Sequence, residues 1–186
     1  MSLALTFAAC SSEDGDDDTA KDLAGQSSED TGSSDPSPTE QQSEGTGESE
    51  PLPEWAPKIV TDDSDGVTGL DFADTPKPGD ELEVFLVKEG DGPEVQKGQT
   101  ITANYFGSVY GSDQPFDESY SSTPFQAPIG VGSLIPGWDQ ALVGVPVGSR
   151  VLLSIPPELG YGKEGSPPVI PPNAHLFFVL DIIEAA

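Results

Sequence analysis

The chain has 186 residues and a formal net charge of −26, with 33 acidic residues against seven lysines and arginines. This charge excludes nucleic acid and anionic lipid headgroups as direct partners, because both require a positive protein surface. A single cysteine and a single histidine exclude an intramolecular disulfide and metal sites rich in cysteine or histidine, and we expect no metal or other cofactor.

The first nine residues are apolar or small, and they end at Cys10. Residues 7–10, Phe-Ala-Ala-Cys, resemble the lipobox of bacterial lipoproteins, in which the cysteine is acylated. The apolar run is shorter than the about 20 residues of a transmembrane helix, and the missing basic n-region indicates a longer natural signal peptide. We interpret residues 1–9 as a signal-peptide remnant and Cys10 as the lipidation site. The alternative is an incidental thiol in a frayed terminus.

Residues 10–53 consist mainly of Ser, Thr, Gly, Pro, Gln, Asp and Glu, with Leu23 and Leu52 as the large apolar exceptions. Such a segment buries too little apolar surface to offset the entropy of ordering, and its like charges repel one another. We predict a disordered, extended acidic linker. A chelator or a binder of basic partners is the alternative.

Residues 54–81 hold too many large apolar side chains for a plain linker, among them Trp55 and Phe72. We interpret them as a partly ordered extension that packs on the following domain. The run from Asp62 to Gly66 hints at a calcium loop. However, no glutamate stands at the twelfth position, where such a loop places its bidentate ligand.

From residue 82 the pattern predicts strands, because apolar, β-branched and aromatic residues alternate with polar ones between Gly-rich and Pro-rich turns. The expected strands are residues 82–87, 100–109, 125–129, 150–155 and 174–183. One short helix is expected at residues 138–143, stopped by Gly144, and a long loop at 156–172. Many strands with one helix favour an α+β fold in which an antiparallel sheet wraps around the helix.

Seven motifs stand in order along residues 82–186: Val87–Pro93, Tyr105–Gly107, Phe116–Asp117, Leu134–Trp138, Val147–Arg150, Gly160–Gly162 and Ile170–Ala174. Together they resemble the FKBP-type peptidyl-prolyl cis-trans isomerases. The resemblance implies a half-barrel antiparallel sheet curled around one short helix, with an apolar pocket between them. We therefore expect residues 82–186 to form an FKBP-type domain.

The resemblance also implies the roles of the pocket residues. Trp138 would form the floor, and the Asp117 carboxylate, the Tyr161 hydroxyl and the Ile135 backbone N–H would act on the bound imide. The substrate-binding residues would be Tyr105, Phe116, Phe125, Leu134, Trp138, Ile170 and Phe178. Taken singly, Trp138, Phe125 and Phe178 each fit an ordinary core better than a pocket, so the ordered set carries the prediction. His175 is interpreted as structural.

The chemistry of X-Pro isomerisation is consistent with this residue set. Rotation about a peptide bond sacrifices amide resonance and meets a barrier of roughly 18–20 kcal/mol. The twisted transition state has less charge separation than the planar ground state, so an apolar, water-excluding pocket favours it. This chemistry requires no nucleophile, metal or proton relay.

Two departures from the family pattern affect the expected site. The loop at residues 118–123 has no arginine, whereas family members often pair one with the aspartate that matches Asp117. Ser166 stands where the best-known members have histidine, within a proline-rich loop. We therefore expect the substrate preference and rate to differ from theirs.

We expect a peptidyl-prolyl cis-trans isomerase that assists the folding of exported proteins, anchored through Cys10 at the extracytoplasmic face of the cell membrane. Its partners would be proline-containing polypeptides and FK506-like macrolides, and the protein would be a monomer. The alternative is a non-catalytic binding module that holds a proline-containing partner. A solute-binding lipoprotein is disfavoured, because one small domain lacks the two lobes that such proteins use.

Overall fold

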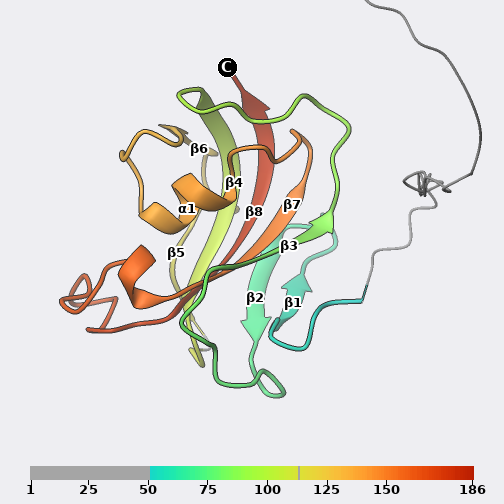
Figure 1. Cartoon of the computed structure of the whole chain (residues 1–186). Helices are drawn as coiled ribbons and strands as arrows, with labels where there is room; N and C mark the ends of the chain where they lie inside the picture. Colours follow the sequence, from blue (N-terminus) through green and yellow to red (C-terminus); the bar gives the residue numbers. More distant parts are fainter. Residues whose placement is uncertain (1–50, 113) are drawn as a thin grey trace, which may run out of the picture. The chain divides into compact units, whose positions relative to one another are not determined.

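The computed structural model describes residues 51–112 and 114–186, which build a six-stranded antiparallel sheet and a separate two-stranded hairpin (Figure 1). The large sheet has the order β3-β7-β8-β4-β5, and β6 also pairs with β4. Its strands are β3 (Glu83–Lys88), β4 (Thr100–Val109), β5 (Pro115–Glu118), β6 (Phe125–Pro128), β7 (Arg150–Ile155) and β8 (Leu176–Ala185). The predicted signal-peptide remnant, Cys10 and linker residues 10–50 lie outside the described residues.

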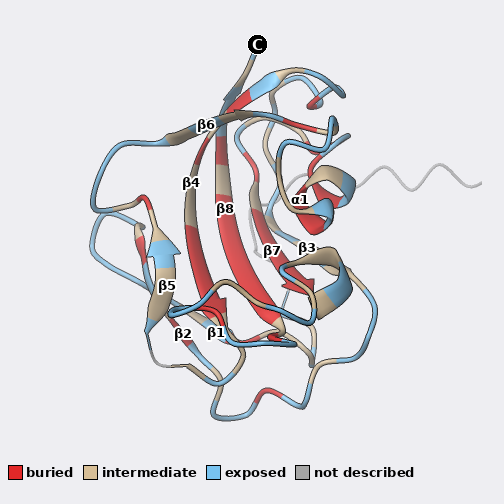
Figure 2. Ribbon diagram, turned by 90° about the vertical axis from the view of Figure 1, so that its left-hand side faces the viewer, coloured by how far each residue is buried: buried red, intermediate tan, exposed pale blue. Residues whose placement is uncertain are grey.

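Strand β8 lies between β7 and β4 and is buried on both faces along most of its length (Figure 2). Successive side chains of a strand point to opposite faces of the sheet. Phe178 and Leu180 therefore belong to the core on one face, while Phe177 and Val179 belong to the core on the other. The sheet thus separates two apolar cores.

The first core lies between the sheet and helix α1 (Pro136–Ala141), where Trp138 and Leu142 are buried. The helix begins two residues before the predicted start at residue 138, because Pro136 occupies the first helical turn, where its fixed φ and missing N–H are tolerated. It ends at Ala141, and Gly144 follows with a φ of +90°. The predicted antiparallel sheet with one short helix is confirmed for the described part of the chain.

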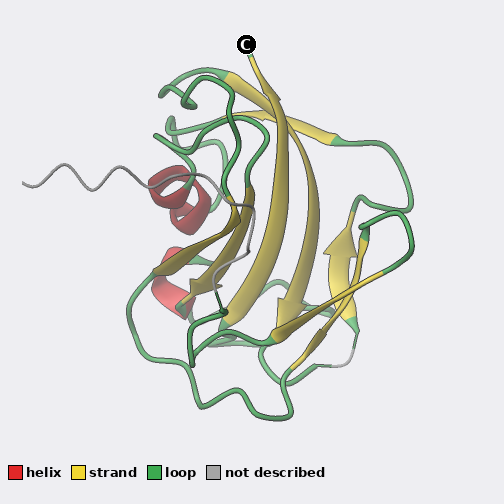
Figure 3. Cartoon of the chain, turned by 90° about the vertical axis from the view of Figure 1, so that its right-hand side faces the viewer, coloured by secondary structure: helices red, strands yellow, loops and turns green. Residues whose placement is uncertain are grey.

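The second core lies under the hairpin of β1 (Lys58–Thr61) and β2 (Val67–Asp71), which covers the opposite face of the sheet (Figure 3). Val67 and Leu70 are buried there in one cluster with Phe177. Arg150 joins the hairpin to the sheet: its guanidinium donates to the Asp65 carbonyl at 2.7 Å and to both carboxylate oxygens of Asp181 at 2.6 and 2.8 Å. Residues 54–81 therefore contain regular structure that the sequence pattern had not assigned.

The Asp-rich turn of the hairpin is closed by one of its own side chains. Asp62 Oδ1 accepts hydrogen bonds from the backbone N–H groups of Ser64 and Gly66 at 2.8 and 3.0 Å. Within residues 51–112 and 114–186, no group of three or more His, Cys, Asp or Glu residues is arranged to hold a metal ion. No helix in this part of the chain is long and apolar enough to cross a membrane.

Strand β5 (Pro115–Glu118) was not predicted, because it has only four residues and one of them is proline. A 3-10 helix (Pro157–Leu159) lies within the predicted loop 156–172. The last strand runs to Ala185, beyond the predicted end at residue 183, because Ala185 pairs with Ile101 of β4. These differences matter for function at β5, which carries two residues of the pocket.

Candidate active site

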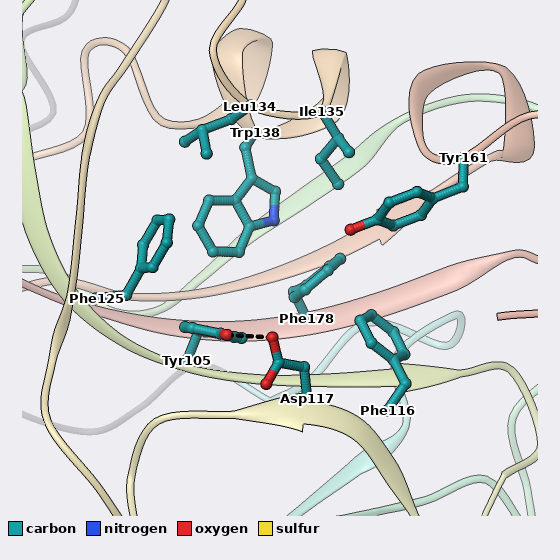
Figure 4. A pocket seen from close by; sticks show the side chains of 9 residues that line it. All are labelled: Tyr105, Phe116, Asp117, Phe125, Leu134, Ile135, Trp138, Tyr161 and Phe178. Atoms are coloured by element: carbon teal, nitrogen blue, oxygen red, sulfur yellow. Dashed lines mark hydrogen bonds between the residues drawn. The ribbon is translucent and has the colours of Figure 1, made fainter. Parts of the chain in front are cut away.

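A cavity of about 130 Å³ opens between α1 and the sheet, and nine of the predicted site residues line it (Figure 4). Strands β4, β5, β6 and β8 contribute side chains, and so do α1, the segment before it and the loop after the 3-10 helix. The lining residues are Tyr105, Phe116, Asp117, Phe125, Leu134, Ile135, Trp138, Tyr161 and Phe178.

The Trp138 indole lies at the centre of this lining and is 5 % exposed. Its ring meets Phe178 edge to face, with centroids 5.2 Å apart, and it meets Tyr105 at 5.5 Å and Phe125 at 5.8 Å in the same manner. Edge-to-face contacts at these separations are favourable, because the positive edge of one ring meets the negative face of another. These four side chains, which we call the aromatic cage, are therefore held in place by their contacts with one another.

Two glycines permit this close packing. A Cβ atom on Gly107 would lie 2.7 Å from the Phe178 ring and 2.8 Å from the Phe116 ring. A Cβ atom on Gly137 would lie 2.7 Å from the side chain of Ile155. Because such distances are below van der Waals contact, glycine at these positions lets the rings and helix α1 approach the sheet closely.

Asp139 fixes the segment that leads into the pocket. Its two carboxylate oxygens accept hydrogen bonds from the backbone N–H groups of Gly130 and Gly132, both at 2.7 Å. This ties the loop before Leu134 and Ile135 to helix α1. The sequence did not predict this role of Asp139, because these hydrogen bonds join helix α1 to a loop seven to nine residues away.

Three hydrogen-bond donors at the pocket have no partner among the described residues. Trp138 Nε1 is buried and unpaired. The backbone N–H of Ile135 and the hydroxyl of Tyr161 make no hydrogen bond within the described part of the chain. A ligand that brings carbonyl oxygens to this side of the pocket would pair the donors of Ile135 and Tyr161, and each such hydrogen bond contributes about 1 kcal/mol.

Asp117 and Tyr105 form a hydrogen-bonded pair on the opposite wall, where the Tyr105 hydroxyl donates to Asp117 Oδ2 at 2.5 Å (Figure 4). Burial, followed by this hydrogen bond and the charge of Asp117, raises the pKa of Tyr105. Burial, followed by the charge of Asp117, also raises the pKa of Tyr161. Both phenols therefore stay protonated at neutral pH, and the Tyr161 hydroxyl remains able to donate.

Ile170 is the one predicted pocket residue that the structure does not place in the lining. It is 3 % exposed within the core, and it exchanges backbone hydrogen bonds with Ser166 at 2.9 and 3.0 Å. It therefore supports the loop behind the pocket. His175 lies on the other face of the sheet, where its Nε2 is 2.9 Å from Ser154 Oγ and its ring lies against Phe177.

The arrangement suits one kind of ligand. Aromatic walls accept a flat apolar ring, and the unpaired donors of Ile135 and Tyr161 can donate hydrogen bonds to carbonyl oxygens beside it. The lining presents one carboxylate, that of Asp117, and no thiol, imidazole or amine. Such a lining suits the binding and orientation of an amide.

Comparisons with known proteins match this region of the chain. The family model for FKBP-type peptidyl-prolyl cis-trans isomerases matches residues 92–183. An FK506-binding protein of Streptomyces anulatus is 40 % identical over 116 residues, which cover 61 % of this chain and 93 % of that protein. FK506-binding protein 2 of Dictyostelium discoideum is 40 % identical over 110 residues, covering 58 % of this chain and 82 % of that protein.

A solved structure agrees with the sequence matches. The crystal structure of AtFKBP13 superposes with a TM-score of 0.52 at 38 % sequence identity, covering 56 % of this chain and 93 % of that chain. The similarity thus extends over nearly the whole of the solved chain.

Proposed function

The chain belongs to the FKBP-type peptidyl-prolyl cis-trans isomerase family, and from this premise we propose that the pocket around Trp138 binds a prolyl ring and catalyses rotation about the preceding imide bond. The enzyme class follows from the matching family model and from the FK506-binding relatives. The roles of the individual residues are the proposal.

In the proposed mechanism the pyrrolidine ring lies on the Trp138 indole, between Tyr105, Phe125 and Phe178. Removing the imide from water disfavours the planar, charge-separated ground state more than the twisted transition state. The backbone N–H of Ile135 and the hydroxyl of Tyr161 hold the substrate carbonyls, and Asp117 acts electrostatically at the edge of the pocket. The uncatalysed reaction takes tens to hundreds of seconds at 25 °C, so even modest stabilisation produces a measurable rate gain.

The observation that carries this proposal is the combination of an aromatic cage with unpaired donors on one wall. Tyr105, Phe125, Trp138 and Phe178 pack edge to face or tilted against one another around the cavity. Beside them, the Ile135 backbone N–H and the Tyr161 hydroxyl have no hydrogen-bond partner among the described residues, so both can donate to substrate carbonyls.

The proposal is tested by measuring cis-trans exchange in an Ala-Leu-Pro-Phe peptide, with and without the chain of residues 1–186. We expect exchange faster than the uncatalysed rate, and we expect the macrolide FK506 to abolish the gain by occupying the pocket. Exchange at the uncatalysed rate, together with tight binding of the peptide, would instead identify a binding module without catalytic activity.

We further propose that the enzyme works on exported proteins at the extracytoplasmic face of the cell membrane. The supporting observation is in the sequence: an apolar segment ends at Cys10, and a long acidic, Ser-rich segment follows it. In this proposal Cys10 carries a lipid, and the linker lets the isomerase domain reach polypeptides emerging from the membrane.

The location is tested by expressing the chain in a bacterium with a known lipoprotein signal peptide of that host in place of residues 1–9. Mass spectrometry of the membrane fraction should find lipid on Cys10, and Cys10→Ser should release the protein from membranes. Persistent membrane association of Cys10→Ser would rule out this anchor, whatever the result of the exchange assay.

A further inference from the structure

Asp117 carries a charge that nothing in the described part of the chain neutralises. It is the only charged residue in the cavity lining. The ion pairs found within residues 51–112 and 114–186 join Arg150 to Asp65 and Asp181, and none reaches Asp117. Asp117 is therefore a lone carboxylate in an otherwise uncharged pocket.

The hydrogen bonds of Asp117 leave this charge in place. Oδ2 accepts from the Tyr105 hydroxyl, and Oδ1 accepts from the backbone N–H of Glu118 at 3.0 Å. Both donors are neutral groups. They orient the carboxylate, and they leave part of its acceptor capacity unused, since an ionised carboxyl group has about four lone-pair sites.

The neighbouring residue adds charge of the same sign. The Glu118 carboxylate accepts hydrogen bonds from the backbone and hydroxyl of Ser121, which lower the pKa of Glu118 and keep it ionised at neutral pH. The charges of Asp117 and Glu118 both raise the pKa of Tyr105 across the pocket wall, after the larger effects of burial and hydrogen bonding. The pocket mouth thus carries a negative field that reaches its aromatic lining.

We propose that Asp117 sets substrate choice, so that the enzyme prefers prolines directly next to lysine or arginine and disfavours prolines next to glutamate or aspartate. This inference rests on the proposed function, because it names the class of substrate for the same pocket. A lysine or arginine beside the bound proline has a long, flexible stem that lets its charge approach the exposed Asp117 carboxylate while the ring occupies the cage. An acidic side chain in that place meets a like charge.

The test uses capped peptides Ala-Xaa-Pro-Phe and Ala-Leu-Pro-Yaa, in which Xaa or Yaa is lysine, glutamine or glutamate. Exchange spectroscopy gives kcat/KM for each peptide with the full chain, without a coupling protease that has its own preference. At low salt we expect kcat/KM for lysine to exceed that for glutamate by roughly three- to tenfold at one of the two positions, the range for an exposed attraction and repulsion combined. In 1 M salt the Debye length falls to about 3 Å and the ratio should approach one.

Two matched variants separate the pocket from the general acidity of the chain. Asp117→Asn removes the charge at the pocket, whereas Asp63→Asn removes an equal charge on the hairpin, across the sheet. The lysine-to-glutamate ratio should fall in Asp117→Asn and persist in Asp63→Asn. If Asp117→Asn is too slow to assay, the same ratio is read from peptide dissociation constants by NMR titration.

Equal kcat/KM values for lysine and glutamate at both positions would overturn the inference, as would equal ratios in the two variants. These results differ from failure of the proposed function. In that case the wild-type chain would not accelerate exchange in the neutral glutamine peptides at all.

Discussion

The hydroxyl of Tyr161 offers a way to separate binding from folding, because it has no hydrogen-bond partner within the described residues and lies at the pocket. Tyr161→Phe should lower kcat/KM by about fivefold, since one hydrogen bond contributes about 1 kcal/mol. The free energy of unfolding should stay within about 0.5 kcal/mol of wild type, as expected for a surface change. Peptide exchange and urea denaturation measure the two effects.

The control is Tyr110, whose hydroxyl donates to the Thr75 carbonyl at 3.1 Å on the opposite face of the sheet. Tyr110→Phe should show the reverse pattern, losing about 1 kcal/mol of stability with unchanged catalysis. If Tyr161→Phe loses stability and keeps its rate, the hydroxyl serves the fold and not the substrate.

His175 is half-buried beside Ser154, and burial lowers its pKa below the usual 6.5, while the charges of Asp80 and Glu158 oppose the shift. The unfolded chain therefore binds a proton at higher pH than the folded one does. Stability from this group is complete above about pH 6.5 and is lost as the pH falls through the folded-state pKa.

Urea midpoints at pH 7.5 and 5.5 test this sign. We expect the midpoint to fall at pH 5.5. The corresponding loss in free energy of unfolding should be well under the limit of about 1.4 kcal/mol per pH unit that one proton allows, because the group is half-exposed. His175→Gln, which can keep the contact with Ser154, should flatten the change. An unaltered slope in His175→Gln would assign the pH dependence to other groups.

At the scale of elements, the hairpin β1–β2 forms part of the second core. Val67 is 2 % exposed under the sheet, whereas Val60 on the paired strand is 42 % exposed. Val67→Ala should cost about 2 kcal/mol of unfolding free energy, from lost burial and a residual cavity. Val60→Ala should cost less than about 0.5 kcal/mol.

Thermal unfolding of both variants measures the contrast. Equal, small effects would mean that the hairpin contributes no stability to the sheet. Catalysis should persist in both variants at 25 °C, because the hairpin and the pocket lie on opposite faces of the sheet.

The sequence predicted the longer elements because their patterns are strong. The alternation in residues 100–109 and the apolar run in 174–183 correspond to β4 and β8. Short elements were not predicted where contacts with distant parts of the chain, and not the local sequence, determine whether they form. Strand β5 forms because Phe106 and Gly107 of β4 pair with it, which a four-residue run containing proline cannot reveal.

The order of the motifs along the chain predicted which side chains line one pocket, and nine of the predicted residues do meet there. Three features of the site could be seen only in the structure. Ile170 is buried in the core and does not line the pocket, Tyr105 donates a hydrogen bond to Asp117, and Asp139 holds the loop before Leu134. Each depends on distances between residues whose spacing in sequence carries no signal.

At the scale of the whole molecule, the two faces of one sheet have different roles (Figure 3). One face forms the pocket together with α1, and the other face packs against the hairpin. The adjacent residues Phe177 and Phe178 of β8 point to opposite faces. Phe178 contacts Trp138 and Phe116 at the pocket, whereas Phe177 contacts Phe72 under the hairpin. Leucine at either position keeps an apolar side chain of reduced size and removes the aromatic contacts.

The most direct test of the central claim, that the pocket floored by Trp138 is where X-Pro rotation is catalysed, compares kcat/KM of Phe178→Leu and Phe177→Leu for the Ala-Leu-Pro-Phe peptide. Phe178→Leu should lose roughly tenfold, because aromatic contacts contribute about 0.5–1.5 kcal/mol each. Phe177→Leu should keep the wild-type rate while losing comparable stability. Equal rates in the two variants, or a loss confined to Phe177→Leu, would contradict the assignment of catalysis to this pocket.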